Sequence, residues 1–477
     1  MTGKIRIESP SQAKLNRNIR RMFWLVAALL TLLALNVLKI SVFDAYSFIT
    51  NPYNSRMALA DNSVRRGRII DAGGTVLAES APAGDGYERR YPRGSTLAHA
   101  VGYSSFGRAG IESVYNFELQ SVNMEFWSRL AQIATGAELL GNDVVLTADA
   151  DFSDAAAKAL GANKGAVVAL DPSTGAVLAM ASSGGLNPAT IAEDWPELSA
   201  SADSPLLNRA TRGLYAPGST FKLVTAAAAI ENIEGWDTLS FVCEGEALLG
   251  GSRIICYDKT AHGAVTMADA FAVSCNTYFA SVGHQMAPES VRRAAAGFMI
   301  GRPLGFALGE SVSRFTLPDA ASDSERTETA IGQGKTLATP LGMAVAAAAV
   351  ANGGVVMKPY ITDRIDLPGG GVKVKFYPET LGQAVSPGTA ESLKALMVGC
   401  VENGTGAAAA VPGVSVAGKT GTAQNASGRD HSWFIGFAPA DEPKTAIAVV
   451  IENAEPGARA AAVAGEILRW RAERSGD

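Results

Sequence analysis

The sequence of 477 residues predicts an α/β fold in which an antiparallel sheet is flanked by helices, preceded by a transmembrane helix and a small β-rich segment. Apolar strand patterns occur at 165–181 and again at 432–451, with alanine-rich helical stretches between them. Strands from both ends of a region pair into one sheet when the helical insertion between them packs on its faces. The first 43 residues contain an apolar run as long as a membrane span.

Residues 22–43 form this run, and about 20 apolar residues suffice to cross a bilayer as a helix. Six basic residues precede it: Lys4, Arg6, Lys14, Arg17, Arg20 and Arg21. After Lys39 the next basic residue is Arg56, so the excess of positive charge predicts a cytoplasmic tail over 1–21. No small-x-small cleavage site follows the run, which favours a retained anchor over a cleaved signal peptide.

Residues 44–145 differ in character from the rest of the chain. Within 65–78, alternating or β-branched residues flank a turn at Gly73 and Gly74, which predicts a β-hairpin. Short pieces separated by glycines follow, and none of them has the character of a nucleophile, a base or a phosphate-binding loop. We interpret 44–145 as a pedestal that holds the domain over 146–477 away from the membrane.

Within 146–477 the elements follow from apolar periodicity and turn residues. The turn at 171–175 joins two apolar strands into a hairpin. An alanine-rich segment that ends at Asn352 and Gly353 is predicted to form a buried helix. The expected strands are 143–147, 165–170, 176–181, 432–438 and 445–451, and the expected helices are 151–160, 223–230, 341–351 and 459–473.

Composition excludes some classes of function. The net charge of −5 argues against non-specific binding of nucleic acid. The four cysteines include no C-x-x-C pair, which argues against a zinc ribbon or a thioredoxin-like motif. Cys243 and Cys256 form either a local disulfide or two unpaired thiols, and the sequence leaves both open. Cys275 is expected to point into the helical core.

The strongest candidate for chemistry is a Ser-x-x-Lys motif that begins at Ser219. Pro217 and Gly218 precede it, and an alanine-rich helix follows it, so Ser219 is an N-cap or first-turn residue. Ser219 and Lys222 are three residues apart and share one face of a helix. This suits a nucleophilic serine with an amine base, provided that desolvation or nearby positive charge keeps the lysine neutral.

Two further motifs raise the significance of the first. Ser274 and Asn276 form a Ser-x-Asn motif 55 residues after Ser219, and Lys419 begins a Lys-Thr-Gly motif 145 residues later. Taken alone, Ser-x-x-Lys occurs often by chance, and its alternative interpretation is a helix cap with a solvated lysine. Ser-x-Asn taken alone is also typical of a helix end. Their conjunction in this order is specific, because penicillin-binding proteins and class A β-lactamases share it.

With these motifs the sequence resembles the class B penicillin-binding proteins, the monofunctional transpeptidases of bacterial cell-wall synthesis. The resemblance covers nearly the whole chain and is strongest to the small elongation- or division-type members. It implies a serine transpeptidase fold, similar to β-lactamases, over 146–477. Further matching segments are the hairpin at 66–69 and residues 165–175, 208–210, 332–334 and 404–406.

The resemblance also implies a role for each motif residue. Ser219 attacks the penultimate D-alanine carbonyl of a stem peptide, and Lys222 takes its proton. Ser274 relays a proton to the leaving group, and Asn276 holds a substrate amide and helps to fix Lys222. Lys419 supplies positive potential. The Thr420 and Thr422 hydroxyls beside Gly421 bind the substrate carboxylate, and the amides of Ser219 and Thr422 form the oxyanion hole.

No metal or other cofactor is expected for this chemistry. The four histidines lie outside the motifs and are expected to be structural or surface residues: His99, His262, His284 and His431. The implied partners are D-alanyl-D-alanine ends of stem peptides, β-lactam antibiotics, the cytoplasmic membrane and a SEDS-type membrane glycosyltransferase, with no nucleic acid.

Three other functions compete with transpeptidation. A β-lactamase needs a general base for deacylation, and no motif supplies one. A β-lactam-sensing receptor needs signalling machinery, and the predicted tail over 1–21 is short. A catalytically inactive scaffold does not need the intact motifs. The sequence leaves the choice between elongation and division, and the type of stem peptide, open.

Overall fold

The computed structural model describes residues 10–42, 64–84, 86–105, 107–120, 138–424, 428–454 and 458–475. The chain divides into two compact units, residues 1–60 and 61–477. Parts of the predicted tail and pedestal, namely 1–9, 44–63 and 121–137, lie outside the described residues.

In the first unit, α1 (Pro10–Val42) contains the predicted membrane segment. Residues Lys14–Ile40 are long and apolar enough to cross a membrane. The helix begins 12 residues before Met22, at Pro10, since proline suits a first helical position and the stretch that follows contains several good helix formers. The predicted span at 22–43 is therefore helical through Val42, and the helix continues toward the N-terminus.

The main sheet of the second unit has five strands in the order β15-β16-β17-β5-β6, all antiparallel to their neighbours. As predicted, strands from the two ends of the domain meet, because β17 pairs with β5 from Ala446 opposite Leu170 to Ile451 opposite Gly165. The strands are β5 (Gly165–Leu170), β6 (Val177–Ser182), β15 (Ala417–Ala423), β16 (His431–Ala438) and β17 (Thr445–Ile451).

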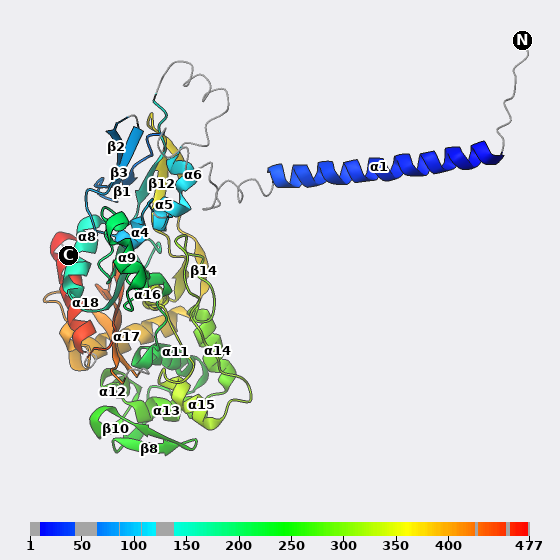
Figure 1. The fold of residues 1–477 in the computed structure, drawn as a ribbon. Coiled ribbons are helices and arrows are strands. Elements are labelled where there is room, and N and C mark those ends of the chain that lie inside the picture. Colours follow the sequence, from blue (N-terminus) through cyan, green and yellow to red (C-terminus); the bar gives the residue numbers. More distant parts are fainter. Residues whose placement is uncertain are drawn as a thin grey trace, which may run out of the picture. The chain divides into compact units, whose positions relative to one another are not determined.

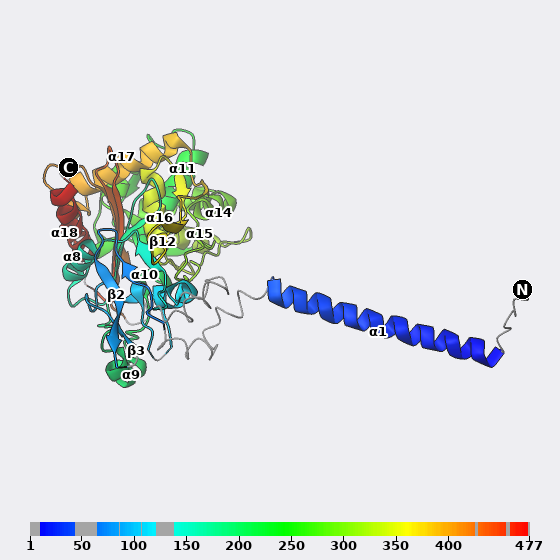
Figure 2. The same cartoon turned by 90° about the horizontal axis from the view of Figure 1, so that it is seen from above.

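Helices cover both faces of this sheet, and Figure 2 shows α18 and α8 on one side of the strands and α16 and α11 on the other. Side chains alternate along β5: Val167 faces the core under α8 and α18, and Val168 faces the core under α16. Phe152 and Trp470 stack with their ring centroids 5.3 Å apart and join the two helices of the first face. The helices are α8 (Ala150–Leu160), α11 (Lys222–Asn232), α16 (Pro340–Ala351), α17 (Pro387–Asn403) and α18 (Ala458–Ser475).

A second sheet has six strands in the order β13-β12-β4-β1-β2-β3. The predicted hairpin is confirmed, with Ile70 opposite Val76. β4 pairs with β1 in parallel and with β12 antiparallel, so this sheet combines segments from both sides of the predicted limit at 145. The strands are β1 (Ile69–Ile70), β2 (Val76–Ala83), β3 (Gly86–Arg90), β4 (Asp143–Leu146), β12 (Thr362–Asp366) and β13 (Val372–Lys375).

A buried charge cluster stabilises the region around the six-stranded sheet. The Glu112 carboxylate is fully buried and accepts hydrogen bonds from Arg66 at 2.7 Å and from Arg89 at 2.6 Å. Arg66 also donates to the Asn116 side-chain oxygen at 2.6 Å. Although burial alone would raise the pKa of Glu112, the two guanidinium groups hold it below its usual range.

A third region, at the bottom of Figure 1, contains short two-stranded sheets beside α12, α13 and α15. Its elements are β7 (Phe241–Cys243), β8 (Glu246–Leu249), β9 (Ser252–Ile255), η2 (Tyr257–Lys259), β10 (Gly263–Val265), α12 (Met267–Ala272), α13 (Asn276–Gln285) and α15 (Asp323–Ala330). The other described elements are α4 (Ala98–Val101), α5 (Gly110–Val114), α6 (Asn116–Leu119), α9 (Ile191–Ala200), α10 (Arg209–Arg212), η1 (Gly218–Phe221), α14 (Pro288–Gly297), β11 (Val355–Met357), β14 (Thr380–Gln383) and η3 (Ala407–Ala409).

Candidate active site

Ser219 lies in η1, a single 3₁₀ turn that leads directly into α11 at Lys222. It is therefore a first-turn residue, one of the two positions that the sequence predicted. Residues three apart lie on the same side of a 3₁₀ turn, so Ser219 and Lys222 face the same region. Ser219 is half-buried, whereas the Lys222 side chain is fully buried.

The Lys222 amine contacts the loop between α12 and α13. Its Nζ lies 2.7 Å from the Ser274 carbonyl oxygen, 2.7 Å from Asn276 Oδ1 and 3.2 Å from Ser274 Oγ. Within the described residues, none of its hydrogen bonds goes to Ser219. The structure thus brings Lys222, Ser274 and Asn276 together as predicted. Ser219 lies near them because its turn leads directly into α11 at Lys222.

The environment of Lys222 favours a neutral amine. Burial lowers the pKa of Lys222 well below its ordinary value, and the positive charge of Lys419 lowers it further. Its Nζ also lies 5.4 Å from the centre of the Phe279 ring. The sequence identified desolvation and nearby positive charge as the requirement for a lysine base, and both are present.

Ser274 connects α12 to α13 with a left-handed backbone, φ 58°. This conformation is uncommon for a residue with a side chain, and it directs both the carbonyl and the hydroxyl of Ser274 to Lys222. Asn276 begins α13, and its Nδ2 donates to the Ile255 carbonyl at 2.8 Å. The Asn276 side chain is thereby fixed between β9 and Lys222.

Lys419 lies on β15 and is fully buried. Its Nζ is 5.6 Å from the centre of the Phe271 ring and 3.1 Å from the Thr420 carbonyl oxygen. Burial lowers the pKa of Lys419, although less strongly than that of Lys222. Lys419 therefore acts on Lys222 through its charge rather than through a direct hydrogen bond.

Thr420 has a partner that the sequence did not assign. Its hydroxyl lies 2.6 Å from the Thr405 hydroxyl, which in turn lies 3.3 Å from the Ala272 carbonyl oxygen at the end of α12. Thr405 lies in the matching segment at 404–406, but no role was predicted for it from the sequence. Thr405 ties the strand of the Lys-Thr-Gly motif to the helix that leads to Ser274.

The turn at Ser219 packs against the backbone of β15. Gly218 has φ 51°, and a Cβ atom at this position would lie 2.3 Å from the Thr422 carbonyl oxygen. A Cβ atom on Gly421 would lie 3.1 Å from the Thr220 backbone nitrogen. Only glycines allow this approach, which places Ser219 next to Thr422 as the predicted oxyanion hole requires.

Hydrogen bonds to Glu452 and Trp433 fix the segment that precedes Ser219. The Tyr215 hydroxyl donates to Glu452 at 2.7 Å, and Arg209 donates to the same oxygen of Glu452 at 2.8 Å. Trp433 donates from its indole nitrogen to the Ala216 carbonyl at 3.0 Å. Arg209 belongs to the matching segment 208–210, and the structure gives it this positioning role rather than contact with Ser219.

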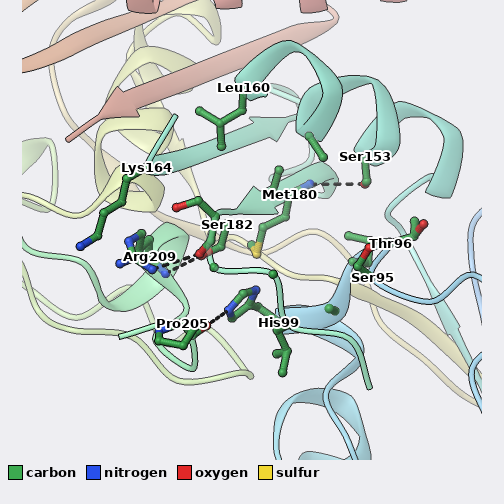
Figure 3. A pocket seen from close by; sticks show the side chains of 18 of the residues that line it. Ser95, Thr96, His99, Ser153, Leu160, Lys164, Met180, Ser182, Pro205 and Arg209 are labelled. Atoms are coloured by element: carbon green, nitrogen blue, oxygen red, sulfur yellow. Dashed lines mark hydrogen bonds between the residues drawn. The ribbon is translucent and has the colours of Figure 1, made fainter. Parts of the chain in front are cut away.

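A cavity of about 620 Å³ is lined in part by Arg209, and Figure 3 shows side chains that surround it. His99, Lys164 and Ser182 also line it, and the His99 imidazole hydrogen-bonds to the Pro205 carbonyl at 2.8 Å. None of the residues predicted for catalysis lines this cavity. His99 was expected to be a structural or surface residue, and its hydrogen bond to Pro205 fits the structural alternative.

Comparison with known proteins identifies the family. A family model described as the penicillin-binding protein transpeptidase domain matches residues 165–469, and one described as the penicillin-binding protein A dimerisation domain matches 66–144. The chain belongs to the class B penicillin-binding proteins. The resemblance inferred from the three motifs is thus confirmed, as is the transpeptidase fold.

This penicillin-binding protein is similar along most of its length to named relatives. It is 35% identical to the peptidoglycan D,D-transpeptidase PbpA of Mycobacterium tuberculosis, over 92% of this chain and 94% of the relative. It is 32% identical to the peptidoglycan D,D-transpeptidase MrdA of Acinetobacter baumannii, over 80% of this chain and 66% of the relative.

Solved structures with similar levels of sequence identity share its fold. The imipenem acyl-enzyme complex of penicillin-binding protein A from M. tuberculosis gives a TM-score of 0.81 at 33% identity, covering 85% of this chain and 98% of that one. A D,D-transpeptidase domain of a peptidoglycan glycosyltransferase from Eggerthella lenta gives 0.79 at 37% identity, covering 87% and 99%.

The charge of Lys419 leads to a prediction about pH. With Lys222 in its predicted role as the base, acylation needs the neutral amine, so we expect the acylation rate to rise with pH through the lowered pKa of Lys222. Lys419→Ala removes the positive charge that helps to lower this pKa, and the acid limb of the pH–rate profile should move to higher pH. Loss of one such electrostatic contact should also raise the activation free energy of acylation by about 2–4 kcal/mol.

Rates of acylation by fluorescent penicillin across pH, with thermal melting of the same samples, measure this effect. Lys358→Ala is the control, because Lys358 pairs with Glu379 at 2.7 Å and is partly exposed. A Lys419→Ala variant with the parent rate and an unmoved acid limb would contradict the role assigned to Lys419.

Proposed function

We propose that this penicillin-binding protein cross-links peptidoglycan stem peptides through an acyl-enzyme on Ser219. The transpeptidase family match and the similarity to named D,D-transpeptidases support the reaction. The assignment of residues rests on the environment of the Lys222 amine. It is fully buried, it donates hydrogen bonds to Ser274 and Asn276, and its burial lowers its pKa.

In the first half-reaction, Ser219 Oγ attacks the carbonyl carbon of the penultimate D-alanine, and its proton moves to Lys222 Nζ. A neutral Lys222 has two N–H bonds, which match the two acceptors at 2.7 Å, and a lone pair that remains for the proton. The C–N bond to the terminal D-alanine then breaks. Ser274 Oγ, 3.2 Å from Lys222 Nζ, passes its proton to the leaving nitrogen and takes up the proton that Lys222 received, so Lys222 is neutral again.

Charge that develops on the carbonyl oxygen is stabilised by the backbone amides of Ser219 and Thr422. The close contact between Gly218 and the Thr422 carbonyl supports this, since it holds the two backbone segments against each other before substrate binds. Lys419 and the hydroxyls of Thr420 and Thr422 bind the terminal carboxylate. The Thr405 contact leaves Thr420 with further hydrogen-bonding capacity, because a hydroxyl has one donor and two acceptor sites.

In the second half-reaction, an amine of a neighbouring stem peptide attacks the acyl-enzyme. The amine loses its proton along the same path, through Ser274 and Lys222, and Ser219 regains its hydroxyl. The acyl-enzyme must survive until the amine arrives, which favours a site that excludes water.

We also infer that α1 anchors the chain in the cytoplasmic membrane with its N-terminus inside, because basic residues precede the apolar segment. The predicted limits, a tail at 1–21, a span at 22–43, a pedestal at 44–145 and a transpeptidase domain at 146–477, remain part of this proposal. It places the transpeptidase domain outside the cell membrane, where peptidoglycan is assembled.

The partner implied by this arrangement is a SEDS-type membrane glycosyltransferase that polymerises the glycan. The two matched family domains cover 66–144 and 165–469, and neither is a glycosyltransferase domain. The purified full-length protein alone should therefore make no glycan strands from lipid-linked precursor. Gel analysis of the products tests this, and polymer made by the protein alone would refute it.

A persistent β-lactam adduct is the main expected outcome. A β-lactam presents an amide carbonyl near a carboxylate, and its opened ring stays tethered, so the acceptor path is blocked. Intact-protein mass spectrometry of the full chain after addition of penicillin should show one covalent equivalent, mapped to the peptide with Ser219. It should persist for many minutes and be absent in Ser219→Ala.

The competing functions give different results in the same experiment. Rapid return of unmodified protein, with an excess of hydrolysed drug, would favour a β-lactamase. A stable adduct together with no cross-linking of peptidoglycan precursor and acceptor amine would favour a β-lactam sensor. Absence of any adduct in the parent protein would favour an inactive scaffold.

A further inference from the structure

Three cysteines and one histidine meet beneath the Ser-x-Asn loop. The ligand atoms of Cys243, Cys256, His262 and Cys275 all lie within 4.8 Å of one another. The three cysteines are buried and His262 is half-buried. They come from four places in the fold: the end of β7, the residue before η2, the residue before β10, and the link between α12 and α13.

The distances fit four ligands around one metal ion. Cys243 Sγ lies 3.7 Å from Cys256 Sγ and 3.3 Å from His262 Nδ1, and Cys256 Sγ lies 3.8 Å from Cys275 Sγ. In a tetrahedral zinc site with Zn–S bonds of about 2.3 Å, neighbouring sulfur atoms are about 3.8 Å apart. A disulfide bond needs about 2.05 Å, and all four cysteines of the chain are free thiols in this structure.

We propose that Cys243, Cys256, His262 and Cys275 bind one Zn²⁺ ion. Three thiolates and one imidazole are a common ligand set of structural zinc sites, and soft sulfur ligands select zinc over magnesium or calcium. Binding displaces the protons of the three thiols and changes no oxidation state. With four protein ligands the site is closed, so the metal is structural and takes no part in the transfer reaction.

Contacts around the cluster favour negatively charged sulfur. The Thr277 hydroxyl lies 3.3 Å from Cys275 Sγ and 3.8 Å from Cys256 Sγ, so one hydroxyl lies near two of the ligands. Cys275 is also the N-cap residue of α13, a helix of ten residues. The positive end of a helix dipole stabilises a thiolate at this position.

The surrounding fold provides a reason for a metal. The strands β7 to β10 contain three or four residues each and form only two-stranded sheets. Isolated two-stranded sheets are marginally stable in water. Large apolar side chains of this region, Val242, Leu248 and Tyr257, are exposed and contribute little burial. A metal that joins β7, η2 and β10 to α13 supplies the missing cross-link.

The same metal positions the catalytic loop, since Cys275 lies between Ser274 and Asn276. The Asn276 side chain bonds to the Ile255 carbonyl, and Ile255 is the residue before the ligand Cys256. Zinc therefore restrains the strained Ser274 backbone from one side while Lys222 contacts it from the other. Cys275 and the other ligands are positioning residues and do not contact substrate.

The test uses the full-length protein in detergent, expressed with added zinc and purified without chelators. Elemental analysis should find one equivalent of zinc in the parent. Cys256→Ser and His262→Ala should each lose it. Cys400→Ser is the matched control and should retain it, because Cys400 is buried but lies outside the cluster, with its Sγ 3.6 Å from the Thr405 hydroxyl.

A second measurement needs no variant. A chelator should remove the zinc, lower the melting temperature and slow acylation by fluorescent penicillin, and added Zn²⁺ should reverse all three effects. Co²⁺ added to the chelated protein should give the visible absorption of a tetrahedral thiolate site. The metal readouts are independent of the transpeptidase assignment, so either proposal can fail without the other.

Zinc-free protein that takes up neither Zn²⁺ nor Co²⁺ would overturn the proposal. So would a mass two hydrogens lower in the protein as purified, with a Cys243–Cys256 disulfide found by peptide mapping. Zinc retained in both Cys256→Ser and His262→Ala would show that the metal binds elsewhere. Zinc present but without effect on melting or acylation would refute the positioning role.

Discussion

Burial of the Lys222 amine is the constraint on which the rest of the site depends. A lysine that is fully buried is costly to charge, and the second buried amine of Lys419 increases that cost. The protein accommodates Lys222 with three polar contacts on the loop at 274–276 rather than with a carboxylate. A carboxylate there would favour the charged form and remove the base.

Much of the fold serves to bring three distant segments to this amine. Pairing of β17 with β5 joins the two ends of the domain. β15, which carries Lys419, is the edge strand of the same sheet beyond β16. Glycine at 218 lets the Ser219 turn approach the Thr422 carbonyl. The contact between Thr405 and Thr420 couples that edge strand to α12, which leads to Ser274. The proposed zinc site would restrain the loop at 274–276 through Cys275.

The sequence predicted the features that depend on local pattern. Hydrophobic periodicity gave the strands at 165–181 and 432–451 and the buried helix at 341–351, and the order of the motifs gave the family. Pairing of the strands from the two ends of the domain was also predicted, but other features that depend on contacts between distant residues were missed. Thr405 carries no motif of its own, and β12, near residue 364, joins the pedestal sheet across more than 200 residues of chain.

The cysteine–histidine cluster was missed for a related reason. Close pairs such as C-x-x-C indicate a metal site in a sequence, whereas Cys243 and Cys256 are 13 residues apart and Cys256 and Cys275 are 19 apart. His262 was expected to be structural or on the surface, and only the fold places its Nδ1 beside Cys243. The predicted burial of Cys275 is confirmed, but its sulfur faces Cys256.

The protonation state of Lys222 in the free protein tests the central claim most directly. The full chain, labelled with ¹³Cε and ¹⁵Nζ lysine, can be titrated by NMR, with the Lys222 signal assigned by its absence in Lys222→Arg. The account predicts a midpoint well below the value of about 10.4 for an exposed lysine, so that the amine is neutral when the enzyme is active. A Lys222 signal that titrates with the exposed lysines would contradict it.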